Sequence, residues 1–443
     1  MAEIIIKNFG PIIASTVEIK QINIFIGPTS TGKSTVAKLI AIFNTLNFIQ
    51  NPSYDAFLSQ LIYYNISFPF TDATYIEYRS KNFYWRFAGK LFATNFFLPA
   101  TINFLAVVQA SIETVGSEPA SIGININGKN IRQIRLPLYL VNSIDIEQIS
   151  REIATIENDV LKEHLIEISQ KLILNRNEIA HNGFLDVTGE FENLSELLRS
   201  VNEEVGVSTP LYIPAERITM SMVAESIFGI LKNDVSLPVC LKDFGAKFEI
   251  ARRGLKEVSI DFFNAVYYQK ENTNIVKLVN GEEIKLEHAS SGFQSLIPMY
   301  IVLQFFLSRR ALIRKSTVIE EPELNLYPKA QKDFVEYLIK LHNNSGDKLF
   351  ITTHSPYVLT TIDNLIQSNN AVANKPQNEE AVASIIDPAL WVNFEDVSCY
   401  YFSNGYCKST LDTENQTIGA SDIDDVSIEL GKVFDQLLDL KYN

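Results

Sequence analysis

A short run of residues near the start of the chain has the spacing of a phosphate-binding P-loop. It reads Gly27-Pro28-Thr29-Ser30-Thr31-Gly32-Lys33-Ser34-Thr35. Its glycines allow successive backbone N–H groups to turn inward around a phosphate, with the positive end of the following helix behind them. Lys33 can then reach the β- and γ-phosphates of a nucleotide, and the Ser34 hydroxyl can ligate Mg²⁺. The loop therefore predicts nucleotide binding.

Two carboxylates follow an apolar run much later in the chain, at Thr317-Val318-Ile319-Glu320-Glu321-Pro322-Glu323. A strand that ends in two carboxylates can place Glu320 near Mg²⁺ and Glu321 where it accepts a proton from an attacking water. A solvated acidic turn is the alternative interpretation.

Two further stretches contain groups that suit an anion. In the first, Ser291 and Gly292 lie between a hairpin strand and an apolar helix, where small residues expose N–H groups and a hydroxyl. An ordinary helix cap is the alternative there. In the second, His354 follows a buried apolar run and can hydrogen-bond a γ-phosphate, although a lone histidine is more often structural.

Alternating strands and helices are expected to position these groups. The P-loop lies between an apolar strand at Ile22–Ile26 and a helix at Val36–Phe43, and later strands at Thr317–Ile319 and Lys348–Thr352 flank a helix at Lys329–Leu341. This order predicts an α/β fold with a mixed, mainly parallel sheet covered by helices on both faces. The other expected elements are hairpins at Tyr75–Phe87, Ile122–Leu136 and Val266–Glu287, a buried helix at Leu91–Ile112, amphipathic helices after Ile144 and at Phe191–Val205, a loop at Ala371–Glu380, a hairpin at Asn404-Gly405 and a closing helix at Ser421–Leu440.

The four motifs, in this order, resemble those of ABC-type ATPase heads in the stand-alone branch related to RecF, SMC/Rad50 and OLD proteins. The resemblance covers residues 1–48 and 208–365. A closer likeness is to the ATPase subunits of bacterial anti-phage systems such as Septu and PARIS. The stretches that carry it are YIPAER (Tyr212–Arg217), SSGFQSLIP, IEEPELNLYP and THSPYVLT.

The resemblance implies a role for each group. The P-loop with Lys33 would hold the phosphates of ATP, Ser34 and Glu320 would ligate Mg²⁺, Glu321 would be the general base, and His354 would be the switch histidine. Ser291 and Gly292 would complete the γ-phosphate site of a second subunit, which implies a homodimer or higher homo-oligomer. Two residues depart from the family pattern: Glu320 stands in place of the usual aspartate, and Phe293 in place of the second signature glycine.

The resemblance also suggests a domain organisation and a biological role. The expected parts are the first part of an ATPase head at 1–48, an insertion of hairpins and a helical arm at 49–207, the second part of the head at 208–370, and an α/β extension at 371–443. We expect an ATPase that senses or regulates in anti-phage defence, with a nuclease or toxin encoded nearby as the effector partner.

The insertion suggests an alternative activity. Residues Arg176 to His181 resemble the Arg-Asn…His motif of HEPN ribonucleases, which implies metal-free RNA cleavage by Arg176 and His181 from paired subunits. A helix end is the simpler interpretation, because basic residues favour the negative pole of a helix and Asn182-Gly183 forms a natural C-cap.

A role in DNA repair is the second alternative. Two basic clusters could contact phosphates: Arg252, Arg253 and Lys256, and Arg309, Arg310, Arg314 and Lys315. The formal net charge of −14 argues against a protein coated in nucleic acid. Three cysteines without metal-type spacing, and an N-terminus without a basic-then-apolar signal, favour a cytoplasmic protein that does not enter a membrane.

Overall fold

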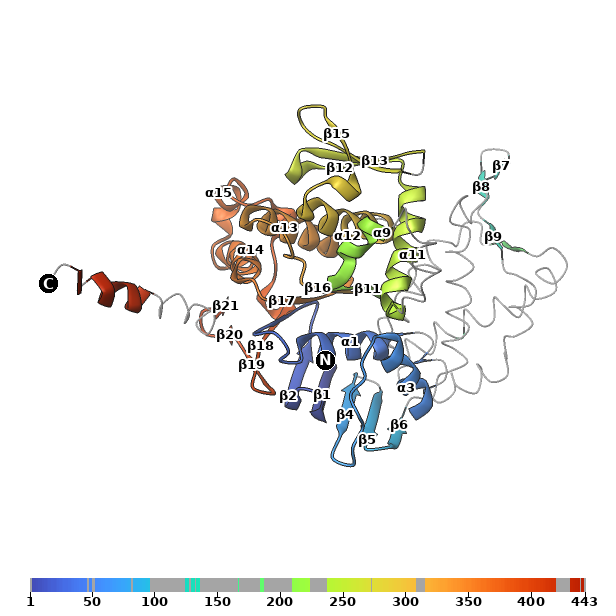
Figure 1. The fold of residues 1–443 in the computed structure, drawn as a ribbon, viewed down its shortest axis with the longest axis vertical. Coiled ribbons are helices and arrows are strands. Elements are labelled where there is room, and N and C mark those ends of the chain that lie inside the picture. Colours follow the sequence, from blue (N-terminus) through green and yellow to red (C-terminus); the bar gives the residue numbers. More distant parts are fainter. Residues whose placement is uncertain are drawn as a thin grey trace.

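One large mixed β-sheet organises the chain (Figure 1). The computed structural model describes residues 2–45, 48–49, 52–80, 83–95, 124–126, 129–131, 133–135, 166, 184–186, 209–223, 237–271, 273–307, 315–419, 431–438 and 440–441. Within these ranges the sheet has 11 strands. In spatial order they are β11 (Thr209–Ile213), β16 (Lys315–Glu320), β17 (Lys348–Thr353), β3 (Ile22–Ile26), β18 (Val397–Ser403), β19 (Tyr406–Ser409), β2 (Ile12–Ile19), β1 (Ala2–Phe9), β4 (Tyr75–Arg79), β5 (Tyr84–Ala88) and β6 (Leu91–Thr94).

The first five strands in this order, from β11 to β18, are mutually parallel. Strands β3 and β16 are buried along their whole length. Continuous burial is expected for parallel strands, because the crossover connections cover both faces of the sheet. The predicted α/β fold with a mixed, helix-covered sheet is confirmed.

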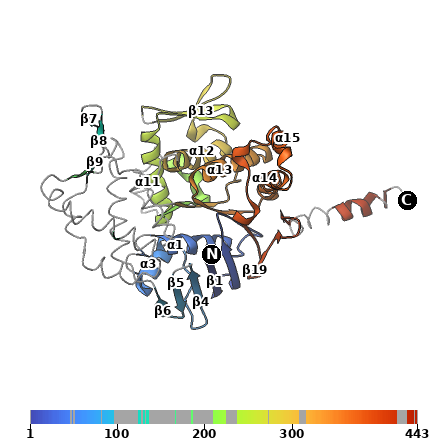
Figure 2. The same cartoon turned by 180° about the vertical axis from the view of Figure 1, so that it is seen from behind.

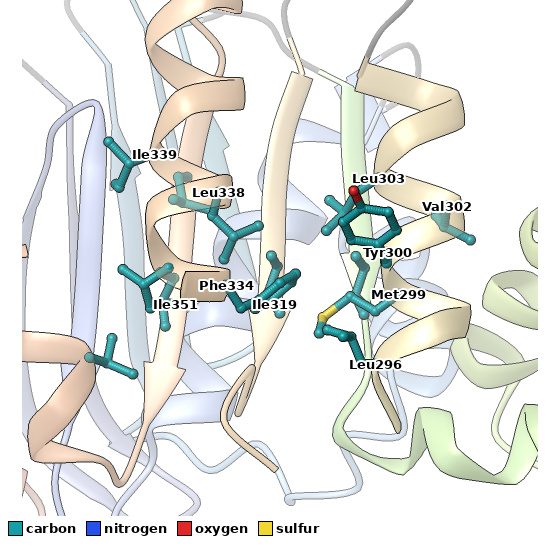
Figure 3. Packing of buried hydrophobic residues seen from close by; sticks show 14 of the residues in the cluster. Leu296, Met299, Tyr300, Val302, Leu303, Ile319, Phe334, Leu338, Ile339 and Ile351 are labelled. Carbon is teal, nitrogen blue, oxygen red and sulfur yellow. The ribbon is translucent and has the colours of Figure 1, made fainter. Parts of the chain in front are cut away.

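Alternate residues of the parallel strands pack against different helices. Phe25, Val318 and Phe350 share a core with α1 (Lys33–Asn44). Ile319 and Ile351 share a second core with α12 (Ser291–Leu307), α13 (Pro328–Ser345) and α14 (Pro356–Asn374). Figure 3 shows the packing of this second core against α12 and α13. The period of two in a strand explains this division. The helices are α1 (Lys33–Asn44), α3 (Tyr54–Tyr63), α9 (Thr219–Val223), α11 (Val239–Gly254), α12 (Ser291–Leu307), α13 (Pro328–Ser345), α14 (Pro356–Asn374) and α15 (Glu379–Ala383).

The antiparallel half of the sheet lies on the other side of α1. Strands β2, β1, β4, β5 and β6 pair antiparallel in that order. In both views α1 lies between these strands and the parallel strands (Figures 1 and 2). Its buried side chains join one core with residues of both halves. The P-loop helix is therefore fixed on two sides.

A smaller antiparallel sheet lies at the far side of α12. It consists of β12 (Glu257–Ile260), β13 (Ala265–Lys270), β14 (Thr273–Lys277) and β15 (Glu283–Lys285). The remaining short elements are β7 (Ile124–Ile126), β8 (Lys129–Ile131), β9 (Gln133–Arg135), β10 (Phe184–Asp186), β20 (Leu411–Asp412), β21 (Thr417–Ile418), and the 3₁₀ turns η1 (Ala215–Ile218), η2 (Asp261–Phe263), η3 (Leu286–His288), η4 (Pro376–Asn378), η5 (Pro388–Leu390) and η6 (Phe394–Asp396).

The predicted hairpins are confirmed where the structure describes them: β4 pairs with β5, β7 with β8, β13 with β14, β14 with β15, and β18 with β19. The helix expected from Leu91 is wrong at its start. Leu91 begins β6, which pairs with β5 across a two-residue turn that contains Gly89 at φ +54°. That turn chemistry overrides the apolar run. Beyond residue 95 this expectation lies outside the described residues.

The loop expected at Ala371–Glu380 is also wrong. Helix α14 continues to Asn374, and α15 begins at Glu379. Side chains near the end of α14, those of Gln367 and Asn370, donate hydrogen bonds to the Gln416 carbonyl. This tertiary contact extends the helix through a polar sequence.

Several expectations fall mainly on residues that the structure does not describe. These are the amphipathic helices after Ile144 and at Phe191–Val205, and much of the closing helix, for which residues 431–438 and 440–441 are helical. Within the described ranges, no helix combines the length and the apolarity needed to cross a membrane.

Candidate active site

Three parallel strands end side by side at one edge of the large sheet. In the register of β3, β17 and β16, Ile26 lies opposite Thr353, and Thr352 opposite Glu320. The P-loop, His354 and the second carboxylate follow these strand ends directly. Loops at the carboxyl edge of an open α/β sheet converge on a ligand site. The structure thus brings the P-loop together with two groups that lie more than 280 residues later in the sequence.

Positive φ angles shape the P-loop: 145° at Gly27, 63° at Ser30 and 104° at Gly32. A backbone that alternates between such conformations can turn successive N–H groups toward one centre, which suits an anion. Lys33 Nζ donates to the carbonyls of Gly27 (2.8 Å) and Pro28 (2.7 Å). Burial lowers the pKa of Lys33, and the three glutamates at and just after the end of β16 (Glu321, Glu323 and Glu320) oppose that shift. The ammonium group is therefore held beside the loop.

Close neighbours exclude side chains at both P-loop glycines. A Cβ atom on Gly27 would lie 2.2 Å from the backbone oxygen of Phe402, and one on Gly32 would lie 2.6 Å from Ile12 Cγ1. The contact at Gly27 is the more severe, because a backbone carbonyl in a strand cannot rotate away. This loop needs glycine at these positions for space as well as for φ.

Glu320 continues the alternation of β16 and faces α1. Its Oε1 lies 3.7 Å from Lys38 Nζ and is buried without a hydrogen bond. Burial raises the pKa of Glu320, and Lys38 opposes the rise. Lys38 follows Ser34 by one helical turn, so both lie on the same side of α1. The Glu320 carboxylate, beside Lys38, is therefore on the side of α1 that carries the Ser34 hydroxyl.

This arrangement fits a magnesium ion. A buried carboxylate oxygen without a hydrogen-bond partner suits a hard cation or a water in its shell. The described residues contain no cluster of three or more His, Cys, Asp or Glu side chains that could hold a metal alone. Mg²⁺ beside nucleotides does not need such a cluster, because it keeps several waters and binds phosphate oxygens.

Glu321 adopts an uncommon backbone conformation at the end of β16, with φ +45°. Its N–H donates to Thr352 O (2.8 Å), and its carbonyl accepts from Leu324 N (3.1 Å). Its side chain is partly exposed, and Oε1 lies 3.5 Å from His354 Nε2. Strained backbone of this kind persists only where surrounding contacts fix it, and it concentrates at functional sites.

Glu323 is the third carboxylate of the motif at the end of β16. Its Oε1 accepts hydrogen bonds from Thr353 Oγ1 (2.8 Å) and from the backbone N–H of His354 (2.7 Å). Burial raises the pKa of Glu323, and these hydrogen bonds oppose the rise. This carboxylate therefore ties the loop that carries His354 to the loop that carries Glu321.

Arg217 is a second residue without an assigned role in the sequence. Its side chain is fully buried beside the ends of β11 and β16, and all its hydrogen bonds to described residues go to main-chain carbonyls. Arg217 ends the YIPAER stretch (Tyr212–Arg217), whose resemblance to the family does not indicate a role for the arginine.

Ser291 begins α12, as expected for a group at a helix start, and Gly292 follows it. A Cβ atom on Gly292 would lie 3.1 Å from the backbone oxygen of Asn325, so the helix start packs against the loop after β16. Phe293, which replaces the second signature glycine, packs edge-on against Phe263 with ring centroids 5.0 Å apart. Helix α12 covers the face of the parallel strands opposite α1 (Figure 1).

Most of the residues on which the two alternative functions depend either lie outside the described residues or are buried. Arg176 and His181 lie outside the described residues. Of the basic clusters, Arg309, Arg310 and Arg314 also lie outside them. Two of the others are buried: Arg252 is in reach of Asn274 Oδ1 at 3.5 Å, and Lys315 donates to the Phe306 carbonyl. These two cations are therefore not available as surface contacts for phosphates.

A family comparison assigns this architecture. The model of a family described as an AAA ATPase domain matches residues 129–359, more than half of the chain. The chain belongs to the AAA ATPase domain family. The match includes Ser291, both carboxylates at the end of β16 and His354, and it begins after the P-loop. As a member of the AAA ATPase domain family, the chain is an ATPase, and the P-loop fold of ABC type is the fold that the sequence predicted.

Solved structures give weaker likenesses. The SMC head domain from Thermotoga maritima is 10% identical, with a TM-score of 0.33, over 92% of this chain and 97% of that one. An SMC head domain from Pyrococcus furiosus, bound to the C-terminal domain of ScpA, is 10% identical with a TM-score of 0.32, over 97% and 100%. The recombination mediator RecF is 12% identical with a TM-score of 0.28, over 92% and 97%. No curated protein sequence matches the chain.

Proposed function

We propose that this ATPase binds ATP and Mg²⁺ at the carboxyl edge of the parallel strands, with Glu321 as the general base. The convergence of the P-loop, Glu321 and His354 at one edge is the observation that carries the proposal. Ser34 and Glu320 would hold Mg²⁺, which when bound neutralises charge on the phosphates.

Each protein group then has a defined task. The N–H groups of Gly27–Thr35 bind phosphate oxygens, and Lys33 exchanges its two carbonyl acceptors for phosphate oxygens. Glu321 accepts the proton of the attacking water at a carboxylate oxygen. His354 lies within 3.5 Å of that carboxylate, and it reports the presence of a γ-phosphate by hydrogen bonding.

Replacement of Glu321 by glutamine tests the base. The substitution removes the proton acceptor and keeps the size of the side chain, so turnover of ATP should fall about 100-fold or more while ATP still binds. The matched control is Glu380→Gln, which changes an exposed glutamate on α15. Turnover by Glu321→Gln at the wild-type rate contradicts the assignment.

We further propose that the active site is shared between two copies of the chain. Ser291 and Gly292 lie on α12, which covers the face opposite the P-loop helix α1. In a head-to-tail dimer or higher homo-oligomer, these residues contact the γ-phosphate bound to the P-loop of the neighbouring copy. Their N–H groups and hydroxyl at the helix start are suited to an anion.

The proposed biological role is that of a cytoplasmic sensor or regulator in anti-phage defence, with an effector nuclease or toxin encoded nearby. The stretches at Tyr212–Arg217 and after β16 and β17 support this role through their resemblance to Septu and PARIS ATPase subunits, in the RecF/SMC branch of ABC-type ATPases. The test is phage plating on bacteria that carry the chain with its flanking genes. Wild type should lower plating efficiency and Glu321→Gln should restore it, whereas equal plating with both contradicts an ATP-driven role.

A further inference from the structure

The segment after β11 contains a guanidinium group in an unusual environment. Arg217 is 0% exposed. It donates to the carbonyls of Glu320 (2.7 Å), Glu321 (2.6 Å), Pro214 (3.2 Å) and Ser295 (3.2 Å). All four acceptors are main-chain oxygens on three different segments of the chain. A buried cation with this set of partners fixes backbone positions, and within the described part of the chain it forms no ion pair with a carboxylate.

The ends of the strands explain why two of these carbonyls are open to a donor from the segment after β11. Strand β11 ends at Ile213, which lies opposite Ile319. The carbonyls of Glu320 and Glu321 therefore extend past the last strand pair on that side. Buried carbonyls without a strand neighbour must find another donor. Arg217 donates to both carbonyls. The Glu321 carbonyl, on the residue that leaves the sheet with φ +45°, also accepts from Leu324 N.

The same segment also holds the first turn of α12. Pro298 lies inside α12 and has no N–H, so the carbonyl of Gln294 loses its helical donor. Ser221 Oγ donates to that carbonyl at 2.6 Å, and Arg217 Nε donates to the next one, that of Ser295. The turn that begins with Ser291 is thus hydrogen-bonded to the segment that holds Glu321.

We propose that Arg217 is a positioning residue, which couples the first turn of α12 to the backbone of Glu321. A ligand bound at Ser291 and Gly292 then sets the position of the base through this guanidinium. The inference rests on the proposed role of Glu321 and adds a regulatory link to that site. Only arginine fits, because the planar guanidinium donates hydrogen bonds to carbonyls in several directions. The lysine ammonium has all its donors on one nitrogen atom.

The coupling predicts a split between binding and turnover. Arg217→Lys keeps the charge and loses the fork, so the catalytic constant should fall about 100-fold through misplacement of the base. The dissociation constant of a fluorescent ATP analogue should stay within about threefold, because no P-loop group changes. Arg252→Lys is the matched control, a buried arginine whose neighbours are Asn274 and Phe248 in another part of the fold, and it should leave both constants unchanged.

A second variant tests the same coupling if Arg217→Lys does not fold. Ser221→Ala removes one hydroxyl that holds the same turn of α12, and it should lower the catalytic constant about threefold to tenfold with unchanged analogue binding. The inference is overturned if Arg217→Lys has the wild-type catalytic constant. If Arg217→Lys does not fold, a wild-type catalytic constant in Ser221→Ala overturns it instead. An equal loss of binding and turnover also overturns it. If Glu321→Gln turns over ATP normally, the proposed function fails instead, whatever the Arg217 variants do.

Discussion

At the scale of single residues, the site depends on backbone conformations that most side chains avoid. Gly27, Ser30, Gly32 and Glu321 all have positive φ. The glycines are required by close neighbours, whereas Glu321 is held by Thr352 and by Arg217 on opposite sides. The carboxylate is therefore placed by hydrogen bonds to its own main chain, which would pre-organise it for the proposed role as a base.

Substitution at Gly27 should show how strictly the loop is packed. In Gly27→Ala, the new Cβ meets the Phe402 carbonyl, so the free energy of unfolding should fall by at least about 2 kcal/mol, and ATP binding should weaken. Gly281→Ala is the control, because Gly281 also has a positive φ but no heavy atom near its Cβ position. It should lose only about 1 kcal/mol from strain. Chemical denaturation measures both, and equal losses contradict the steric explanation.

Residues recognised by motif and residues found only in the structure differ in one physical respect. In the proposed site, Lys33, Ser34, Glu320 and Glu321 would act on a ligand whose chemistry demands such side chains at fixed spacing. Residues such as Arg217, Glu323 and Lys38 act on other parts of the protein, so their roles depend on contacts between segments far apart in the chain. A single sequence does not reveal which carbonyl a buried arginine will meet.

At the scale of elements, contacts between segments far apart in the chain also limit how well the ends of helices and strands can be predicted. The parallel strands were predictable because their apolar runs are continuous and buried. Strand β6 was missed because a turn at Gly89 decides its pairing, and the end of α14 was missed because Gln416 extends it from outside. In both places a contact between segments overrides local composition.

Strand β4, in the antiparallel half of the sheet, offers a test of electrostatics at this scale. Glu77 on β4 is 0% exposed and accepts hydrogen bonds from Tyr75, Arg79 and Arg86. Burial tends to raise its pKa, but these hydrogen bonds hold it at about 2. Because the folded pKa lies below the unfolded value, the ionised form stabilises the fold above about pH 4.5, and this contribution disappears as the pH falls toward 2.

Glu77→Gln should therefore destabilise the chain by about 2–3 kcal/mol at pH 7, since two arginines lose their shared carboxylate. The difference from wild type should shrink as the pH falls from about 5 to about 2.5. Thermal unfolding across this pH range measures it, with the exposed Glu380→Gln as control. A difference that stays constant with pH contradicts the ionised pair.

At the scale of the whole molecule, the fold separates the two ends of the proposed nucleotide site. The P-loop helix α1 lies between the two halves of the sheet, whereas Ser291 begins a helix on the opposite face of the parallel strands (Figures 1 and 2). The spacing of residues in the sequence carries no information about whether these groups meet within one copy or between two. The proposal of a shared site therefore depends on how two copies of the chain associate.

Mixing two inactive variants tests this claim most directly. Lys33→Ala removes the phosphate-binding cation, and Ser291→Asp keeps a favourable helix start but repels a phosphate. Each variant alone should be inactive. A 1:1 mixture should recover about a quarter of wild-type ATP turnover, because half of the dimers then contain one intact site out of two. A mixture as inactive as its components would show that each copy carries its own complete site, and it would contradict the account.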